Sequence, residues 1–271
     1  MAQLYRAGRM SAVLTWPIDI LRPMCYNNIM RSAKIFITIT VILSCACAGI
    51  AAAFEAPLPF EEGEELIYDI YYKQMKLGVS KLKFNGQKTF EGRDLYHITF
   101  YTDVPGFEDT EEIYAHKETF LPFRISRKIK RIGCLPQKID ETYDQETCSV
   151  TINDKGNIFS RPQTIQKECP IYNPLLLTYY YRTMSHEECS RKKSISLPKA
   201  DFDIVLKGKE KVSSGLGEEM AYVFSGEPSK FTFWLSADDK KIPIKISGHN
   251  VFGYSFVLNT IKRGGRAEDG E

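Results

Sequence analysis

Apolar side chains recur at every second position in several stretches of the chain. Five such stretches begin at Leu66, Tyr96, Phe231, Ile242 and Phe252. A period of two places one face of a β-strand in a core and the other in water, which is typical of antiparallel sheets. Turn-forming pairs such as Asn85-Gly86 and Pro105-Gly106 separate the stretches. The pattern therefore predicts a mainly β protein with an antiparallel sheet.

One segment departs from this period. Asn173 is a residue type that caps helices, and Pro174 suits the first helical position. The following run, Leu175 to Met184, has its apolar residues at helical spacing. We expect one short helix at about residues 172–184, packed on the sheet.

The segment of residues 30–53 has the three-part layout of a secretory signal. Two basic residues, Arg31 and Lys34, precede an apolar run from Ile35 to Leu43, and small residues follow up to Ala53. A positive start, a short apolar middle and a small-residue cleavage site are the three parts of a secretory signal peptide. The pattern predicts a cleaved signal peptide, which makes residues 1–29 an upstream extension.

Two other fates of this segment stay open. The stretch from Ile35 to Phe54 has 20 positions, close to the ~20 residues that span a bilayer, although polar residues interrupt it. Alternatively, Ser44 precedes Cys45 as in a lipoprotein processing site, and Cys45 would then be lipidated. We expect a periplasmic or exported protein, with membrane anchoring as the alternative.

Removal of the leader changes the charge of the chain. Residues 1–53 hold five Lys or Arg and one acid, so the formal net charge falls from +2 to −2. A near-neutral chain gives no indication of nucleic-acid binding. The remaining residues suffice for one exported β domain, residues 54–262, followed by a Gly-rich, charged and flexible tail, residues 263–271.

Four cysteines follow the leader, and an even number in an exported chain favours disulfides. Three pairings are possible, and we expect the two that close short loops, Cys134–Cys148 and Cys169–Cys189. No pair has the C-x-x-C spacing of common zinc sites, so we expect no metal and no cofactor.

The sequence contains no catalytic motif. G-x-S-x-G, H-E-x-x-H, P-loop and G-x-G-x-x-G patterns are all missing, and the four histidines are scattered. Two acidic runs, Glu61–Glu65 and Glu108–Glu112, would suit a glycan hydrolase only if two carboxylates faced each other across a cleft. We expect a protein that is not an enzyme, with an envelope-glycan hydrolase as the third alternative.

Tyrosine and phenylalanine are abundant and fall on the apolar positions of the strands. On a curved sheet they would either interlock as a core or line an apolar groove for an acyl chain, lipid or other amphiphile. The candidate lining residues are Tyr68, Ile70, Phe100, Phe233 and Phe256.

The strand-like stretch Arg124 to Arg131 carries basic residues on both faces. It would suit an exposed edge strand, which charges protect from aggregation, or a contact with anionic headgroups. Together with Trp234 it supports the alternative function, a structural or protein-interaction module of the cell envelope with an envelope protein as partner. The oligomeric state stays open.

Two stretches resemble a family of bacterial exported proteins, domain-of-unknown-function family 3108. The opening Phe60-Glu61-Glu62-Gly63-Glu64-Glu65-Leu66-Ile67-Tyr68 is similar to the start of its first strand, and Phe233 to Ile246 is similar to its late hairpin. The resemblance spans Phe60 to Lys262. It implies an exported antiparallel β domain, a curved sheet or half-barrel distantly similar to lipoprotein carriers, and supplies no catalytic residues. The four cysteines and the residues upstream of the leader depart from the family.

Overall fold

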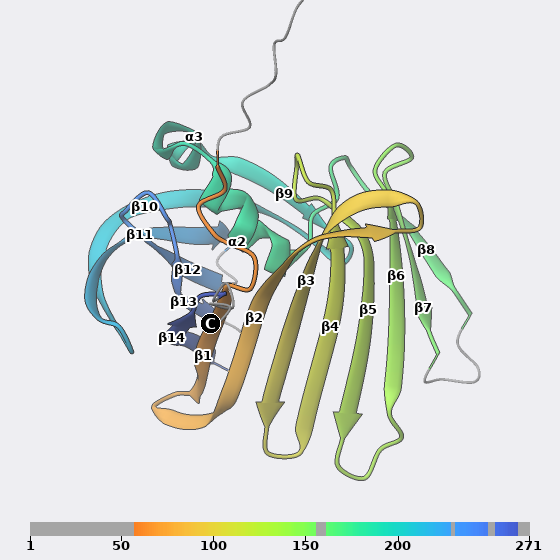
Figure 1. The fold of residues 1–271 in the computed structure, drawn as a ribbon, viewed down its shortest axis with the longest axis horizontal. Helices are drawn as coiled ribbons and strands as arrows, with labels where there is room; N and C mark the ends of the chain where they lie inside the picture. Colours follow the sequence, from red (N-terminus) through yellow and green to blue (C-terminus); the bar gives the residue numbers. More distant parts are fainter. Residues whose placement is uncertain (1–56, 156–160, 229–230, 249–252, 265–271) are drawn as a thin grey trace, which may run out of the picture. The chain divides into compact units, whose positions relative to one another are not determined.

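A computed structural model describes residues 57–155, 161–228, 231–248 and 253–264. The leader, Cys45, His249 and most of the expected tail therefore lie outside the described residues. Within them the chain forms fourteen strands and two helices (Figure 1). The strands are β1 (Glu65–Tyr72), β2 (Met75–Phe90), β3 (Arg93–Val104), β4 (Phe107–Ala115), β5 (Pro122–Arg131), β6 (Gln137–Asp144), β7 (Ser149–Asp154), β8 (Gln163–Gln166), β9 (Lys193–Leu197), β10 (Ala200–Ser214), β11 (Gly217–Glu227), β12 (Phe231–Ser236), β13 (Pro243–Gly248) and β14 (Tyr254–Lys262).

All fourteen strands belong to one antiparallel sheet in the order β8-β7-β6-β5-β4-β3-β2-β1-β14-β13-β12-β11-β10-β9. Strands that follow each other in sequence are neighbours, except β8 and β9, which form the two edges, and β1 also pairs with β14 at a seam between the two ends of the domain. Beyond this seam the sheet bends, and β10 to β14 curl away from the array of β2 to β8 (Figure 1). The edges β8 and β9 stay separate, so the sheet is curved but open, as the sequence predicts.

Helix α2 (Pro174–Thr183) confirms the expected helix. Asn173 Oδ1 accepts hydrogen bonds from the backbone N–H groups of Leu175 (2.9 Å) and Leu176 (3.2 Å), which satisfies two donors that every helix leaves free at its start. A second helix, α3 (His186–Ser190), was not expected. A capping box between Ser185 and Glu188 starts this single turn.

Helix α2 joins two hydrophobic clusters. Leu176 and Tyr179 pack with the cluster on β1 to β7, whereas Leu177 and Tyr181 pack with the cluster on β9 to β12. All four side chains are buried. The helix therefore presents apolar residues to both halves of the bent sheet, which explains why so short a helix is stable.

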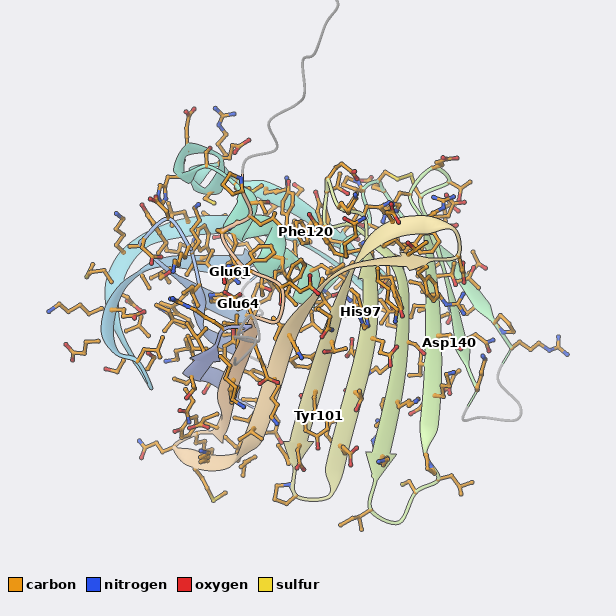
Figure 2. The ribbon with its side chains drawn as sticks, viewed as in Figure 1. Glu61, Glu64, His97, Tyr101, Phe120 and Asp140 are labelled. Atoms are coloured by element: carbon orange, nitrogen blue, oxygen red, sulfur yellow. A yellow bond between two sulfur atoms is a disulfide. The ribbon has the colours of Figure 1, made fainter. Side chains whose placement is uncertain are left out.

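Arg182, in the last turn of α2, is the largest fully buried side chain that the structure describes. Its Nη2 lies 3.1 Å from Glu64 Oε2, in the segment before β1 (Figure 2). Its Nε donates to the carbonyl of Lys240 at 3.1 Å and Nη2 to that of Pro59 at 3.2 Å. The guanidinium also lies 4.7 Å from the Phe60 ring centre. One side chain thus ties the helix to two distant segments.

The basic stretch forms β5, which lies between β4 and β6. The expectation of an edge strand is therefore wrong. Its charges are accommodated because neighbouring strands supply acids, such as Glu108, which lies 2.9 Å from Lys130, and Asp109, which binds Arg127. Sequence alone does not show which strands become neighbours.

The disulfide prediction is also wrong, because the structure pairs Cys148 with Cys169. Cys134 and Cys148 flank opposite ends of β6, an eight-residue strand that spans ~26 Å at about 3.3 Å per residue, which no disulfide bridges. Cys148 and Cys169 instead flank the β7–β8 hairpin on the same side, since Ser149 pairs with Gln166. The bond closes this edge hairpin, and Cys134 (exposed) and Cys189 (buried) are free thiols.

The buried contacts of Arg182 predict that its replacement destabilises the protein far more than the replacement of an exposed arginine. Replacing Arg182 by alanine leaves the Glu64 carboxylate buried without its partner and should lower the free energy of unfolding by about 3–5 kcal/mol. Arg191→Ala is the matched control, because its ion pair with Glu187 is exposed and such pairs contribute below about 1 kcal/mol. Urea unfolding checks both, and equal losses would contradict the assigned role of Arg182.

The exposure of the two free thiols predicts the order in which they react with an alkylating reagent. Iodoacetamide added to the native protein should modify Cys134, and Cys189 should react only after unfolding because it is buried. Peptide mapping without reductant should then recover Cys148 and Cys169 in one linked pair. A linked peptide that contains Cys134 or Cys189 would contradict this pairing.

Candidate ligand-binding cavity

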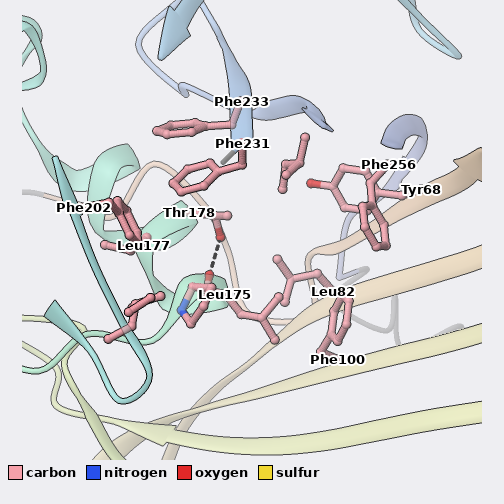
Figure 3. Close-up of a pocket in the computed structure, with 14 residues that line it drawn as sticks. Tyr68, Leu82, Phe100, Leu175, Leu177, Thr178, Phe202, Phe231, Phe233 and Phe256 are labelled. Carbon is pink, nitrogen blue, oxygen red and sulfur yellow. Dashed lines mark hydrogen bonds between the residues drawn. The ribbon is translucent and has the colours of Figure 1, made fainter. Parts of the chain in front are cut away.

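An apolar cavity of about 330 Å³ lies between helix α2 and the inner face of the bent sheet (Figure 3). Its walls come from both halves of the sheet and from one side of the helix. The lining residues are Tyr68, Leu82, Phe100, Pro174, Leu175, Leu177, Thr178, Leu197, Ala200, Phe202, Phe231, Phe233, Ile246 and Phe256.

Strand register brings the sheet residues to one face. Leu82 is directly opposite Phe100 across β2 and β3. On the other half, Ile246 is opposite both Phe256 and Phe233, so three strands place their side chains in one row. Side chains opposite each other in an antiparallel pair point to the same face of the sheet. The lining is therefore a consequence of the pairing order.

The two hydroxyl groups in the lining are already engaged. Tyr68 Oη donates to the carbonyl of Pro243 at 2.9 Å, and Thr178 Oγ1 donates to the carbonyl of Leu175 at 2.7 Å (Figure 3). Burial raises the pKa of the Tyr68 hydroxyl far above its usual value, so the group stays neutral. The cavity thus presents hydrocarbon and aromatic surface with no free side-chain donor.

Four of the five expected lining residues, Tyr68, Phe100, Phe233 and Phe256, lie on this cavity. Ile70 does not. It is on the same face of β1 as Tyr68 and is directly opposite Phe256, but it is buried in the sheet packing outside the lining.

Sequence reasoning missed the residues from β9, β10 and α2. Phe231 shares the alternation of Phe233 and could have been included on that signal. Leu197, Ala200 and Phe202 could not, because only the long-range path of the chain brings β9 and β10 around to this cavity.

Aromatic rings pack against each other within the walls of the cavity. Phe233 stacks on Phe224 with ring centres 4.9 Å apart, and Phe231 meets Phe202 edge-to-face at 4.8 Å. The two expected alternatives, an interlocked core and an open cavity, are therefore both present. The rings interlock within the walls and leave the space between the walls and α2 open.

A polar patch adjoins the cavity on the inner face of β4 to β6. Glu111 is directly opposite Phe100 of the lining and also opposite Arg127 of β5. Arg127 Nε lies 2.9 Å from Asp109 Oδ1 and 3.3 Å from Glu111 Oε1. Tyr143 Oη donates to Glu141 Oε2 at 2.6 Å. The inner face therefore changes from apolar to charged next to Phe100.

Two charged groups of the patch, Glu111 and Arg127, have shifted pKa values. Burial raises the pKa of Glu111 to about 7, and the nearby Arg127 guanidinium offsets this effect only in part. The hydrogen bond with Asp109 raises the pKa of Arg127, which stays charged. Asp109 and Glu111 are on one strand and share Arg127, so they do not face each other across a cleft as a hydrolase would need.

The described histidines and Trp234 do not contribute to the cavity. His97, His116 and His186 are outside its lining. Trp234 is buried on the opposite face from Phe233, where its Nε1 donates to Glu210 at 2.6 Å and the Lys245 ammonium lies 4.9 Å from the ring centre. A tryptophan covered in this way is a poor anchor for a partner.

The raised pKa of Glu111 predicts a pH-dependent stability. Between about pH 5 and pH 7 the folded protein keeps a proton that the unfolded chain releases, so stability falls as pH rises, by up to about 3 kcal/mol above pH 7. Glu111→Gln removes this loss and should gain stability relative to the wild type as pH rises from 5 to 8. Urea unfolding of both proteins across this range measures the gain. Glu112→Gln, on the exposed face of the same strand, should show no such trend, and a pH-independent effect of Glu111→Gln would contradict the prediction.

Neither described helix is long and apolar enough to cross a membrane. No curated protein matches the sequence.

Two solved structures are similar. A beta-barrel-like protein of domain-of-unknown-function family DUF1849 from Brucella abortus has 9% identity and a TM-score of 0.46, covering 75% of this chain and 98% of its own. A putative lipoprotein from Parabacteroides distasonis has 11% identity and a TM-score of 0.27, covering 77% of this chain and 100% of its own. The sequence also matches, over residues 67–259, the family described as "Protein of unknown function (DUF3108)", so the chain belongs to this family.

Proposed function

We propose that this protein binds an acyl chain, or the apolar part of another amphiphile, in the cavity between α2 and the sheet, and that it acts without catalysis. The observation that carries the proposal is the cavity itself, whose fourteen lining residues offer apolar surface and two engaged hydroxyls. Small-molecule sites typically occupy about 300–1,000 Å³ and are lined in this way, with few polar groups.

Water is a poor occupant of such a cavity. A buried water molecule needs about two to four polar partners, and apolar cavities accept hydrocarbon instead. The Tyr68 and Thr178 hydroxyls already donate within the protein. Filling the space with a hydrocarbon chain removes apolar wall surface from water, at about 25 cal/mol per Å², which is the source of affinity that this site can supply.

The neighbouring polar patch favours an amphiphile over a pure hydrocarbon. Phe100 belongs to the lining, and Glu111 is directly opposite Phe100 on the next strand. A ligand whose tail lies against Phe100 would place its polar end near Glu111 and Arg127. The ligand needs no metal or cofactor for such binding.

Export to the periplasm or envelope is part of the same proposal. The Cys148–Cys169 disulfide supports it, because such bonds persist in oxidising compartments and are rare in the cytosol. The leader of residues 30–53, with its three-part layout, supports the same location.

Filling the cavity should weaken ligand binding without unfolding the protein. Ala200→Leu adds hydrocarbon directly into the lining and should weaken binding of a fluorescent fatty-acid analogue about tenfold or more, since overpacking a site costs about 1–3 kcal/mol. Fluorescence titration measures the dissociation constant. Lys199→Leu is the matched control, because it introduces the same side chain at the exposed neighbouring position.

Two results would contradict the proposal. The wild type could fail to bind the analogue after delipidation in denaturant and refolding, or Ala200→Leu could bind as well as Lys199→Leu. Unfolding midpoints of both variants establish that they are folded, because a cavity-filling change should keep or raise stability.

A further inference from the structure

The turn between β5 and β6, residues 132–136, carries two aliphatic side chains in water. We call this turn the β5–β6 tip. Ile132 is 84% exposed and Leu135 is 87% exposed, the highest values among the large hydrophobic residues that the structure describes. Turns of this kind normally use polar residues, and single exposed hydrophobic residues are common. Two of them on one short turn point to a binding surface.

Local hydrogen bonds hold the tip in shape. The backbone N–H of Ile132 donates to the carbonyl of Gly106, in the β3–β4 turn, at 3.0 Å. The N–H of Cys134 donates to the carbonyl of Arg131 at 3.1 Å, and Gly133 takes a positive φ of 73° that suits glycine. The tip lies beside the β3–β4 turn at the end of the sheet away from the helices (Figure 1). In this arrangement the Ile132 side chain lies beside Gly106, and both aliphatic side chains stay largely exposed.

Basic residues flank the tip along β5 and β6. From Arg127 to Ile139 the sequence contains no acid, and the hairpin carries Lys128, Lys130, Arg131 and Lys138. Nearby acids compensate only some of them. Glu108 pairs with Lys130 at 2.9 Å, and Lys138 is 4.0 Å from Asp140. Lys128 and Arg131 have no acidic partner within the described residues.

A convex aliphatic tip with a basic collar matches the surface of an anionic bilayer. Aliphatic side chains enter the acyl boundary, while lysine and arginine reach the lipid phosphates at the level of the headgroups. A protein partner would need a groove with acidic rims, and protein interfaces rely more on aromatic anchors, which this tip lacks. We propose that the β5–β6 tip docks the protein on anionic membranes by inserting Ile132 and Leu135. The inference is independent of the ligand cavity.

Cys134 lies between the two aliphatic residues and is exposed, so it offers a native position for a probe. The full-length chain is labelled with an environment-sensitive fluorophore, and the signal of a Cys134→Ser protein is subtracted to remove labels at other cysteines. Vesicles of an equal mixture of phosphatidylcholine and phosphatidylglycerol should shift the emission to the blue. Pure phosphatidylcholine vesicles should give little shift.

Two sets of variants test the two parts of the tip. Ile132→Ser with Leu135→Ser should reduce the affinity for the mixed vesicles about tenfold or more, because the insertion loses its apolar area. Lys128→Gln with Arg131→Gln should reduce it about tenfold, and added salt should have the same effect. Leu216→Ser, an exposed leucine on the β10–β11 turn, should leave the affinity unchanged.

The probe keeps the test specific to the tip. If another segment of the chain carries the protein to vesicles, the label on Cys134 stays in water, and its unchanged emission overturns the proposal. A blue shift that persists in the Ile132→Ser, Leu135→Ser protein also overturns it. The fatty-acid titration of the same variants should match the wild type, so failure of docking and failure of the cavity proposal are distinguishable.

Discussion

The buried contact between Arg182 and Glu64 sets the position of helix α2, and the inner structure of the protein depends on that position. The guanidinium is fully buried and is bound by one carboxylate and two backbone carbonyls, those of Pro59 and Lys240. A buried charge that loses its partners is strongly unfavourable. Movement of α2 would therefore disturb the segment before β1 and the turn after β12 at once.

The cavity follows from this fixed helix. A bent sheet of fourteen strands encloses more inner surface than a ten-residue helix covers, and the aromatic rings on the walls pack against each other as well as against the helix. The space that remains is bounded by apolar side chains on every strand that contributes to it. Further along the same face, Asp109, Glu111 and Arg127 replace the apolar residues. One face of one sheet thus carries an apolar surface and a charged surface side by side.

The errors of the sequence analysis have a common origin. The interpretation of Arg124–Arg131 as an edge strand assumed that a strand with charges on both faces must lie at an exposed edge. The pairing of Cys134 with Cys148 assumed that cysteines close in sequence are close in space. A strand separates its two ends by ~3.3 Å per residue, so β6 holds Cys134 and Cys148 apart. β6 also pairs with one edge of β5, and β4 pairs with the other edge, so β5 lies inside the sheet. Spacing along the sequence does not show how far apart two cysteines lie or which strands become neighbours.

The sequence by itself determined the antiparallel β class, a short helix at about residues 172–184, which forms at residues 174–183, and the face on which Tyr68, Phe100, Phe233 and Phe256 lie. It could do so because alternation, capping and turn residues act over a few neighbours. Only the tertiary structure decided that β1 pairs with β14, that Leu197, Ala200 and Phe202 complete the cavity and that Cys148 joins Cys169. These relations depend on how distant strands order themselves in the sheet. That order is set by the packing of the whole inner face around α2, which no local pattern records.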